Sequence, residues 1–522
     1  MVPADRRRLL VPAVAGLVVL ALLWLVRPVW HGLALALWTT PLVWLPPLAI
    51  LAAGAVALRR STTWRTIEDL ESGGRRPPAW LAAFPIAAFV VFVLAGALHG
   101  TLVTRAIATA TTYEPIPSLP PGGTVRLVPR DVAEQNASSA FNSSTETLTD
   151  FRIVNTPQGL RWTALRTPQG VFRVFNRKSQ GLVVLDAEQT ARSLEQVDAE
   201  LAVAPGLRIT DGLRWRLLKR RFLVELQEAV GIQTGDGPRI IVPYLERRGV
   251  LVRRPVLGGV FVVAPDGSIE DLSPAEAAGR PELARTGRVF PDTLARRLHD
   301  AYALRGGIWN AWFVHEDQTQ VTDTETNRQP YLIDFGGALG TQWVTVAEPY
   351  GRAFAASAIF LTDTRSGRTR VWRVPPGRSL SGNRRALQAV RAVSIPGIDF
   401  TDFLAVEPRP AFVRGRLVYV VSVIPTSANA VSKTVVVDAE TNKLVQVFDN
   451  DRDPQAEEKT LRYLQTGALP GEAAPRTEDE PGAPATTVRD RLDDLLRRQR
   501  ELVQELEALR EQVAREGAQA GG

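Results

Sequence analysis

Three long apolar stretches near the start of the chain constrain its fold more than any other feature. They cover residues 9–26, 32–58 and 80–103. Each is long enough for a helix that crosses a hydrocarbon core of about 30 Å, which takes roughly 17–25 residues. We therefore expect residues 1–104 to form a membrane anchor with three transmembrane helices.

The first two stretches have features that bear on the shape of the second helix and on whether the first is cleaved. Pro41, Pro46 and Pro47 should kink the second helix, so that neighbouring helices have to satisfy the freed carbonyl groups. The first stretch follows three arginines, as the apolar part of a signal peptide does. It ends in LVRPVW, which contains no small-residue cleavage site, so we expect an uncleaved helix.

The arginines around these stretches predict an orientation. Three arginines precede the first stretch, only Arg27 separates the first two, and five arginines lie in residues 59–79. Positive charge concentrates on the cytoplasmic side of membrane proteins. We therefore expect a cytoplasmic N-terminus, and three crossings would then place the chain after residue 104 outside the cell membrane.

Composition limits the chemistry that this outer part can perform. The chain has no cysteine and four histidines, which excludes disulfides and thiolate chemistry and makes a histidine-rich metal site unexpected. The sequence contains no P-loop, G-x-S-x-G, H-E-x-x-H or EF-hand pattern. It therefore predicts no catalytic residue, no cofactor and no metal.

Residues 105–465 contain four segments with one pattern: an apolar strand often holding an aromatic residue, a variable stretch, a second strand, and a turn with aspartate. The segments are 160–190, 238–268, 341–369 and 416–444, and their turns hold Asp186, Asp266, Asp363 and Asp438. Gly or Asn in these turns suits hairpin connections. We expect an extracytoplasmic α+β domain of four hairpin units, at about 129–190, 238–268, 341–369 and 381–451.

Helical patterns lie between the predicted strands, and helices should pack on one face of each sheet. The candidate helices are 129–141, 190–201, 211–231, 273–283, 291–306 and 381–393. Two short echoes suggest duplication, because TDFRIV at 149–154 precedes the first hairpin and TDFLAV at 401–406 precedes the fourth. The alternative is that any α+β protein has hairpins with aspartate in their turns.

The helix followed by paired strands that end in VVVDAETN, residues 435–442, resembles PepSY-type modules. The resemblance is best at 381–451 and next best at 129–190. It implies an extracytoplasmic or membrane-anchored bacterial protein that binds or regulates, and some such modules accompany peptidases as inhibitory pieces. The chain departs from simple examples in having four fused units and a three-helix anchor.

The C-terminal region divides into a linker and a predicted coil. Residues 466–487 are rich in Pro, Gly, Ala and acidic residues, which is typical of a flexible linker. Apolar residues then recur with a 4-3 spacing, so we expect a coiled coil over 488–516 that joins copies of the chain or recruits a partner protein. The alternative is one amphipathic helix docked on its own domain. The seam residues are Val488, Leu492, Leu495, Gln499, Leu502, Leu506, Leu509 and Val513.

The segment 306–329 is the first candidate binding surface. Trp309 and Trp312 lie beside paired glycines and form either a packed loop or an aromatic binding surface. The next residues, His315, Glu316 and Asp317, belong to a polar patch that also holds Asp323 and Glu325. This patch either surrounds a hard cation or is a solvated loop.

A basic run is the second candidate surface. Arg214, Arg216 and Lys219 belong to RWRLLKRR, residues 214–221. An extracytoplasmic location argues against a nucleic-acid partner, so the run either faces anionic lipid or an acidic polymer, or is a solvated helix face.

The sequence as a whole predicts a membrane-anchored, extracytoplasmic protein of a bacterial-type cell envelope that binds, scaffolds or regulates without catalysis. Its expected partners are the lipid bilayer and a protein joined through the coil. Two alternatives remain: an accessory inhibitor or regulator of an envelope peptidase or transporter, and an enzyme that uses residues 306–329. A viral or plasmid-borne origin is equally compatible with the residues.

Overall fold

The computed structural model describes most of residues 4–468. The described ranges are 4–60, 82–141, 143–170, 178–189, 194–208, 210–324, 329–351, 354–427 and 429–468. Residues 469–522 lie outside them, and with them nearly all of the expected linker and the whole of the expected coiled coil, including its seam. The coil therefore stays a prediction.

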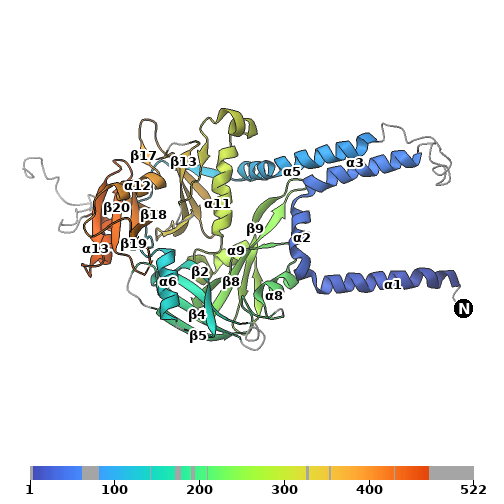
Figure 1. Cartoon of the computed structure of the whole chain (residues 1–522), viewed down its shortest axis with the longest axis horizontal. Helices are drawn as coiled ribbons and strands as arrows, with labels where there is room; N and C mark the ends of the chain where they lie inside the picture. Colours follow the sequence, from blue (N-terminus) through green and yellow to red (C-terminus); the bar gives the residue numbers. More distant parts are fainter. Residues whose placement is uncertain are drawn as a thin grey trace, which may run out of the picture. The chain divides into compact units, whose positions relative to one another are not determined.

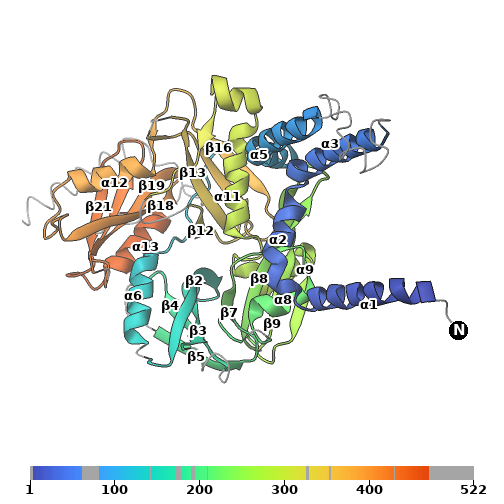
Figure 2. The ribbon, with the colours of Figure 1, turned by 45° about the vertical axis from the view of Figure 1, so that its right-hand side comes forward.

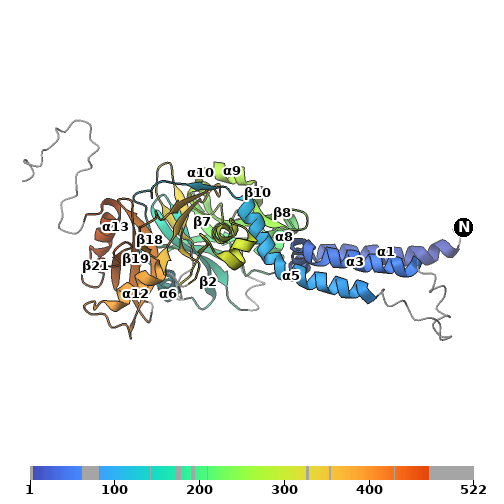
Figure 3. The same cartoon turned by 90° about the horizontal axis from the view of Figure 1, so that it is seen from above.

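Four apolar helices open the chain, and two of them are long and apolar enough to cross a membrane. These two are α3 and α5, while α1 and α2 meet at a bend of 90° and would provide a third span only if the bent pair counts as one. Figures 1 and 3 show α1, α3 and α5 leaving the folded body on the same side, and Figure 1 shows α2 lying across their base. The bounds are α1 Ala4–Leu25, α2 Arg27–Thr39, α3 Pro41–Arg60 and α5 Ala83–Ala110.

The expectation of one helix over 32–58 is wrong, because the chain breaks between α2 and α3. Thr40 has a φ of −119° and a ψ of 42°, outside the helical region. A residue before proline is pushed away from the helical conformation, and Pro41 has no N–H to continue the hydrogen-bond ladder. Pro46 and Pro47, by contrast, lie inside α3.

Beyond the anchor, most strands belong to four antiparallel meanders, which confirms the expected α+β class. Two meanders form separate four-stranded sheets (Figure 2). The strands of the first are β2 Glu146–Thr156, β3 Gly159–Pro168, β4 Ser179–Asp186 and β5 Leu194–Leu201. Those of the last are β18 Phe403–Val413, β19 Arg416–Pro425, β20 Lys433–Asp438 and β21 Leu444–Asp449.

The two middle meanders carry extra strands. The second runs β7 Val230–Thr234, β8 Gly237–Arg248, β9 Arg254–Val263 and β10 Ile269–Leu272, and β6 Glu225–Leu226 also pairs with β8. The third runs β12 Tyr331–Asp334, β13 Thr341–Pro349, β15 Ala358–Asp363 and β16 Thr369–Arg373. Two short strands extend the third, β1 Tyr113–Pro115 beside β16 and β11 Thr319–Gln320 beside β13, and β14 Ala355–Ala356 pairs with β17 Leu380–Ser381.

The helices of the body follow most of the sequence predictions. They are α6 Arg130–Ala140, α8 Leu213–Arg220, α9 Pro274–Gly279, α10 Pro281–Arg285, α11 Asp292–Ala301, α12 Asn383–Ala392 and α13 Ala456–Thr466. The helix expected over 190–201 is wrong, because Leu194–Leu201 pairs with β4 as strand β5. The helix expected over 211–231 ends at Arg220, and the residues after it pair with β8. Pairing with a neighbouring strand overrides local helix propensity in both places.

Three of the meanders share a hydrogen bond that ties the second strand to the segment before a helix. In each case the turn aspartate pairs with a residue on the neighbouring strand, and the next residue of that strand is aromatic. It donates a hydrogen bond to the carbonyl two residues before α6, α11 or α12. The pairs are Trp162 Nε1 to Val128 at 3.1 Å, Trp343 Nε1 to Phe290 at 2.8 Å, and Tyr419 Oη to Ser381 at 2.8 Å.

The turn aspartates of the same three meanders are also alike. Oδ1 of Asp186, Asp363 and Asp438 accepts the backbone N–H groups two and three residues ahead, which fixes the turn. Asp266 differs, because it lies beyond the end of β9 and accepts one N–H, from Ser268, at 2.9 Å. The expected pattern of four matching aspartates therefore describes three.

The first strands of the first and last meanders share a bulge. Asp150 and Glu407 both have left-handed φ values, 56° and 48°, and each lies where the strand register shifts. The bulge makes Thr149 correspond to Val406 and not to Thr401. TDFRIV and TDFLAV are therefore not at equivalent positions, and this part of the argument for duplication is wrong.

Candidate functional site

A charged cleft of about 810 Å³ is the strongest candidate site of the body. It lies between α6 and α11 and draws residues from three of the four meanders. Six arginines line it: Arg126, Arg130, Arg152, Arg288, Arg296 and Arg297. Their carboxylate partners are, in the same order, Glu407, Glu134, Glu228, Asp292, Asp300 and Glu225.

The floor of the cleft consists of two matched stacks of arginine on tryptophan. The Arg126 guanidinium lies 5.2 Å from the centre of the Trp162 ring, and that of Arg288 lies 4.9 Å from the centre of Trp343. Each arginine occupies the position four residues before its helix starts. A cation over the face of an indole is an attractive contact that also orients the guanidinium.

Glu407 is the buried node at one end of this floor. Its side chain is 2% exposed and bonds to Arg126 at 3.1 Å and Arg409 at 3.4 Å, while the N–H of Arg130 donates to it at 3.2 Å. Burial lowers the pKa of Arg409 to about 10, and the negative charge of Glu407 opposes this shift. The node joins the segment before α6 to strand β18, more than 270 residues later.

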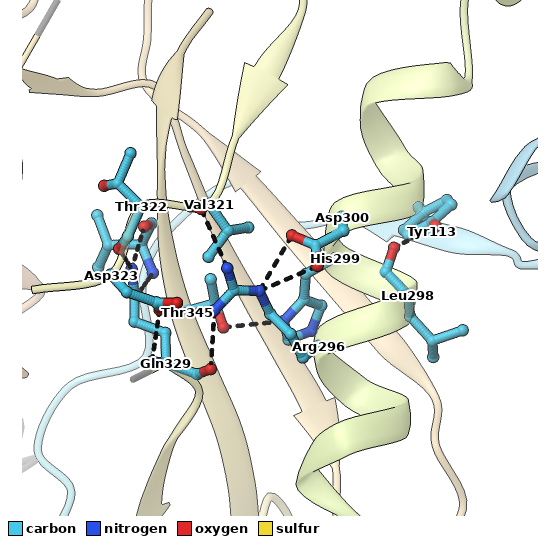
Figure 4. A network of polar contacts seen from close by, with 11 residues as sticks. Tyr113, Arg296, Leu298, His299, Asp300, Val321, Thr322, Asp323, Gln329 and Thr345 are labelled. Atoms are coloured by element: carbon cyan, nitrogen blue, oxygen red, sulfur yellow. Dashed lines mark hydrogen bonds and ion pairs between the residues drawn. The ribbon is translucent and has the colours of Figure 1, made fainter. Parts of the chain in front are cut away.

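At the other end of the cleft, Arg296 of α11 gathers the loop that leads into β12 (Figure 4). Its guanidinium bonds to Asp300 at 3.0 Å and Asp323 at 2.7 Å, and to the carbonyls of Val321 and Gln329 at 3.1 Å. Burial raises the pKa of Asp300, and Arg296 partly offsets this increase. With so many acceptors, Arg296 holds the cleft wall and is not free for a ligand.

His299 lies one residue before Asp300 and points away from the cleft into the sheet (Figure 4). It is 1% exposed, and its two ring nitrogens bond to the hydroxyls of Thr345 and Thr362 at 2.8 Å each. The ring stacks on Phe360 with centroids 4.9 Å apart. Burial lowers its pKa to about 3, so His299 is neutral and links α11 to the third meander through its hydrogen bonds.

The mouth of the cleft is negative on the α6 side. The pKa of Asp131 is raised by burial and then by the charges of Glu407 and Glu134. The arginines are already paired, so the cleft has no cationic pocket ready for a small anion. Its chemistry suits a partner segment that brings its own charges, with a cationic group facing Asp131.

The structure does not gather the polar patch expected around 306–329. His315 stacks on Tyr350 with centroids 4.1 Å apart, Asp317 pairs with Arg373 at 3.3 Å, and Asp323 pairs with Arg296. The backbone N–H of Glu316 bonds to Asn310. Among the residues that the structure describes, no cluster of three or more His, Asp or Glu side chains could hold a metal ion. Glu325 lies outside the described residues.

The two tryptophans of this segment are on the surface. Trp309 is 70% exposed and precedes a π-helical turn, Asn310–Val314, that carries Trp312 and Phe313. Trp309 and Phe313 pack with ring centroids 4.4 Å apart. The turn is therefore an exposed aromatic surface and not a packed loop.

The basic run lies against the N-terminal apolar helices. The backbone carbonyl of Leu25 accepts a hydrogen bond from Lys219, and Arg214 approaches His31 at 3.4 Å. Arg216 lies 4.0 Å from Asp211. Three leucines of α8 are buried beneath these charges, so the run is one side of the junction between body and anchor.

The cleft residues were missed by the sequence analysis, although one pattern points to them. RLVP at 126–129 and RVFP at 288–291 both place an arginine three residues before the proline that precedes a helix. Pro129 and Pro291 both take the N-cap position with an extended backbone, and the repeated arginine marks both stacks.

Fold and site together define a mixed α+β protein with a charged cleft and two or three helices that could span a membrane. No model of a known protein family matches the chain, and no curated protein matches it significantly. Its function is therefore inferred from its residues and their geometry.

Proposed function

We propose that the protein is a membrane-anchored binding or scaffold protein of the cell envelope, with an extracytoplasmic body and no catalytic role. The observation that carries this proposal is the placement of the apolar helices, since α1, α3 and α5 all meet the body at one end (Figure 1). In the sequence, arginines occur before residue 9, where α1 begins, and in residues 59–79, where α3 ends and the chain leads to α5. The positive-inside rule then places the body outside.

Three arginines support a rigid connection between anchor and body. Arg27 of the anchor donates to the carbonyl of Lys219, and Arg253 of the body donates to that of Trp38 at 3.0 Å. Arg105 near the end of α5 donates to the carbonyls of Leu304 and Arg305 at 2.5 and 2.8 Å. A body held in this way keeps a defined orientation to the bilayer.

We further propose that the meanders are related, PepSY-like units and that the body is a binding surface built from them. Supporting this are the shared aromatic hydrogen bond, the shared aspartate turn and the shared bulge. The second meander fits less well, because Asp266 is placed differently. The cleft between α6 and α11 is then the binding site for a charged segment of a partner, and the C-terminal coil joins copies or recruits that partner.

Topology is the test of this proposal. A tag after residue 522 is probed with protease on intact cells, on spheroplasts and on lysed spheroplasts. We expect protease to remove the tag and degrade the body without lysis of the inner membrane. A tag that is lost only after lysis would place the body in the cytoplasm and refute the proposal.

A further inference from the structure

Helix α2 has two apolar faces, and within the part of the chain that the structure describes, protein covers only one of them. On the covered face, His31 Nε2 is 3.0 Å from the carbonyl oxygen of Val224, and the Trp30 and Phe222 rings pack with centroids 4.9 Å apart. On the other face, Val29 is 75% exposed and Leu33 is 66% exposed, with Leu37 also exposed one turn later. An apolar stripe of this kind needs a partner, because water disfavours it.

The tip of the β8–β9 hairpin continues this exposed surface. Val250 is 81% exposed and Leu251 beside it is also exposed. Arg253 fixes the tip to α2, because its guanidinium lies 3.6 Å from the centre of the Trp38 ring and bonds to the Trp38 carbonyl. The hairpin tip and α2 therefore form one apolar surface.

The position of α2 identifies what covers this surface. At 1.5 Å per residue, a 13-residue helix is about 20 Å long, too short to cross a core of about 30 Å. It lies at 90° to α1 and leads directly into α3, so it starts and ends at the level where these helices meet the body (Figure 1). Tryptophans and arginines surround it, as is typical of the membrane interface: Trp24, Arg27, Trp30, Trp38 and Trp44.

We infer that α2 and the tip at Val250–Leu251 form a collar that lies in the leaflet next to the body, with the apolar faces at the boundary of headgroups and acyl chains. The occupant is bilayer lipid, and the inference rests on the proposed membrane anchoring, in which α1, with 22 residues and a length of about 33 Å, crosses the bilayer without α2. The basic residues of α8, which packs behind α2, then lie close to the headgroup phosphates. The collar holds the body at a fixed height and tilt on the membrane.

Single-cysteine labelling tests the collar, because the chain has no native cysteine. Full-length variants Leu33→Cys, Leu37→Cys and Val250→Cys carry a nitroxide in phosphatidylethanolamine–phosphatidylglycerol vesicles. Accessibility to oxygen and to a water-soluble nickel chelate is measured for each. Phe89→Cys in α5 is the reference for lipid and Leu404→Cys in β18 the reference for water, since both residues are exposed.

We expect the three collar positions to show several-fold lower nickel accessibility than Leu404→Cys, with a depth shallower than that of Phe89→Cys. Water-like values at Leu33, Leu37 and Val250 beside a lipid-like Phe89 would overturn the collar and leave the anchor intact. A depth at Leu33 and Leu37 equal to that of Phe89 would also overturn it, because α2 would then lie in the core. Spin–spin broadening that grows with protein density would show a second copy on the surface, which again contradicts the collar. A water-like Phe89 would instead refute the anchoring.

Discussion

The junction around Glu407 and the interior behind α11 bury polar side chains equally well but in different ways. Glu407 is held by two arginines and joins segments that are far apart in sequence. His299 is held by two threonine hydroxyls, within a single helix and meander. The comparison shows that buried polar groups of this fold are satisfied by charge pairing at the first place and by neutral hydrogen bonds at the second. The two regions should therefore respond to different perturbations, acid at His299 and loss of charge at Glu407.

Acid should have the largest effect, and it should act through His299. Its pKa is about 3 in the folded protein and about 6.5 when unfolded, so the unfolded chain binds the extra proton between these values. Stability from His299 is complete above about pH 6.5 and is lost as the pH falls towards 3, by up to about 5 kcal/mol at 1.36 kcal/mol per pKa unit.

Denaturant unfolding at pH 7 and pH 4, followed by tryptophan fluorescence, measures this loss. His299→Gln should remove about 3 kcal/mol of the difference between the two pH values, because glutamine does not titrate. His315→Gln is the matched control, because it removes an imidazole that is not fully buried. An unchanged pH difference in His299→Gln would contradict the buried neutral histidine.

Removing the charge of Glu407 should destabilise the junction around this residue. Glu407→Gln leaves Arg126 and Arg409 buried without their carboxylate, which should destabilise the body by about 3–5 kcal/mol. Asp150→Asn is the matched control, since Asp150 occupies the equivalent position in the bulge of β2 and also has a left-handed backbone. Asparagine tolerates that conformation, and we expect a change within about 1 kcal/mol. Equal losses in both variants would show that the bulge, and not the ion pairs, stabilises the junction.

The aromatic hydrogen bonds should give a smaller effect that is common to the meanders. Trp343→Phe removes the indole N–H that bonds to Phe290 and leaves that carbonyl unpaired in the interior, at a cost of about 2 kcal/mol. Tyr419→Phe should lose about 1 kcal/mol for the same reason. Thermal unfolding in detergent measures both losses, with the exposed Trp309→Phe as a neutral control. If the Tyr419→Phe variant is as stable as the original chain, the aromatic hydrogen bond does not stabilise the last meander and is no evidence that the meanders are related.

The smallest expected change in stability is the one that distinguishes Asp266 from the other turn aspartates. Asp438→Ala leaves two backbone N–H groups without their acceptor and removes the ion pair with Arg416. We therefore expect the free energy of unfolding to fall by about 1–2 kcal/mol. Asp266→Ala removes one exposed hydrogen bond and should change stability by less than about 0.5 kcal/mol. The same unfolding experiment compares them. Similar losses would return Asp266 to the group of matching aspartates.

Local patterns predicted much of the fold. The α+β class, the two paired strands that lead to Asp186, Asp363 and Asp438, and the helix that precedes each of these meanders were all visible in short stretches of sequence. The break at Thr40 was missed, because three prolines in one apolar stretch suggested a kink at each and gave no reason to prefer Pro41. Residues 194–201 were assigned to a helix because nothing local reveals that β4 pairs with them.

The cleft could not be predicted in the same way. Arg126 meets Glu407, and Arg288 bonds to the carbonyl of Ile153, across separations that only packing between meanders defines. The tryptophans that carry the stacks were recognisable as strand residues, but their partners lie in the segments before the helices. Trp309 and Trp312 were recognisable as a local run of aromatic residues, but the sequence did not decide between a packed loop and the exposed turn that the structure shows.

The three arginines that join body and anchor have a consequence for how such a chain can diverge. Each donates to main-chain carbonyls, and every amino acid supplies that acceptor. Lys219, Leu304 and Arg305 can therefore be exchanged for other residues without loss of these bonds, whereas Arg27, Arg105 and Arg253 cannot. Relatives of this protein should thus keep three basic donors in place while the acceptor positions drift, and the contact between the apolar helices and the body should outlast most changes in the sequence of the body.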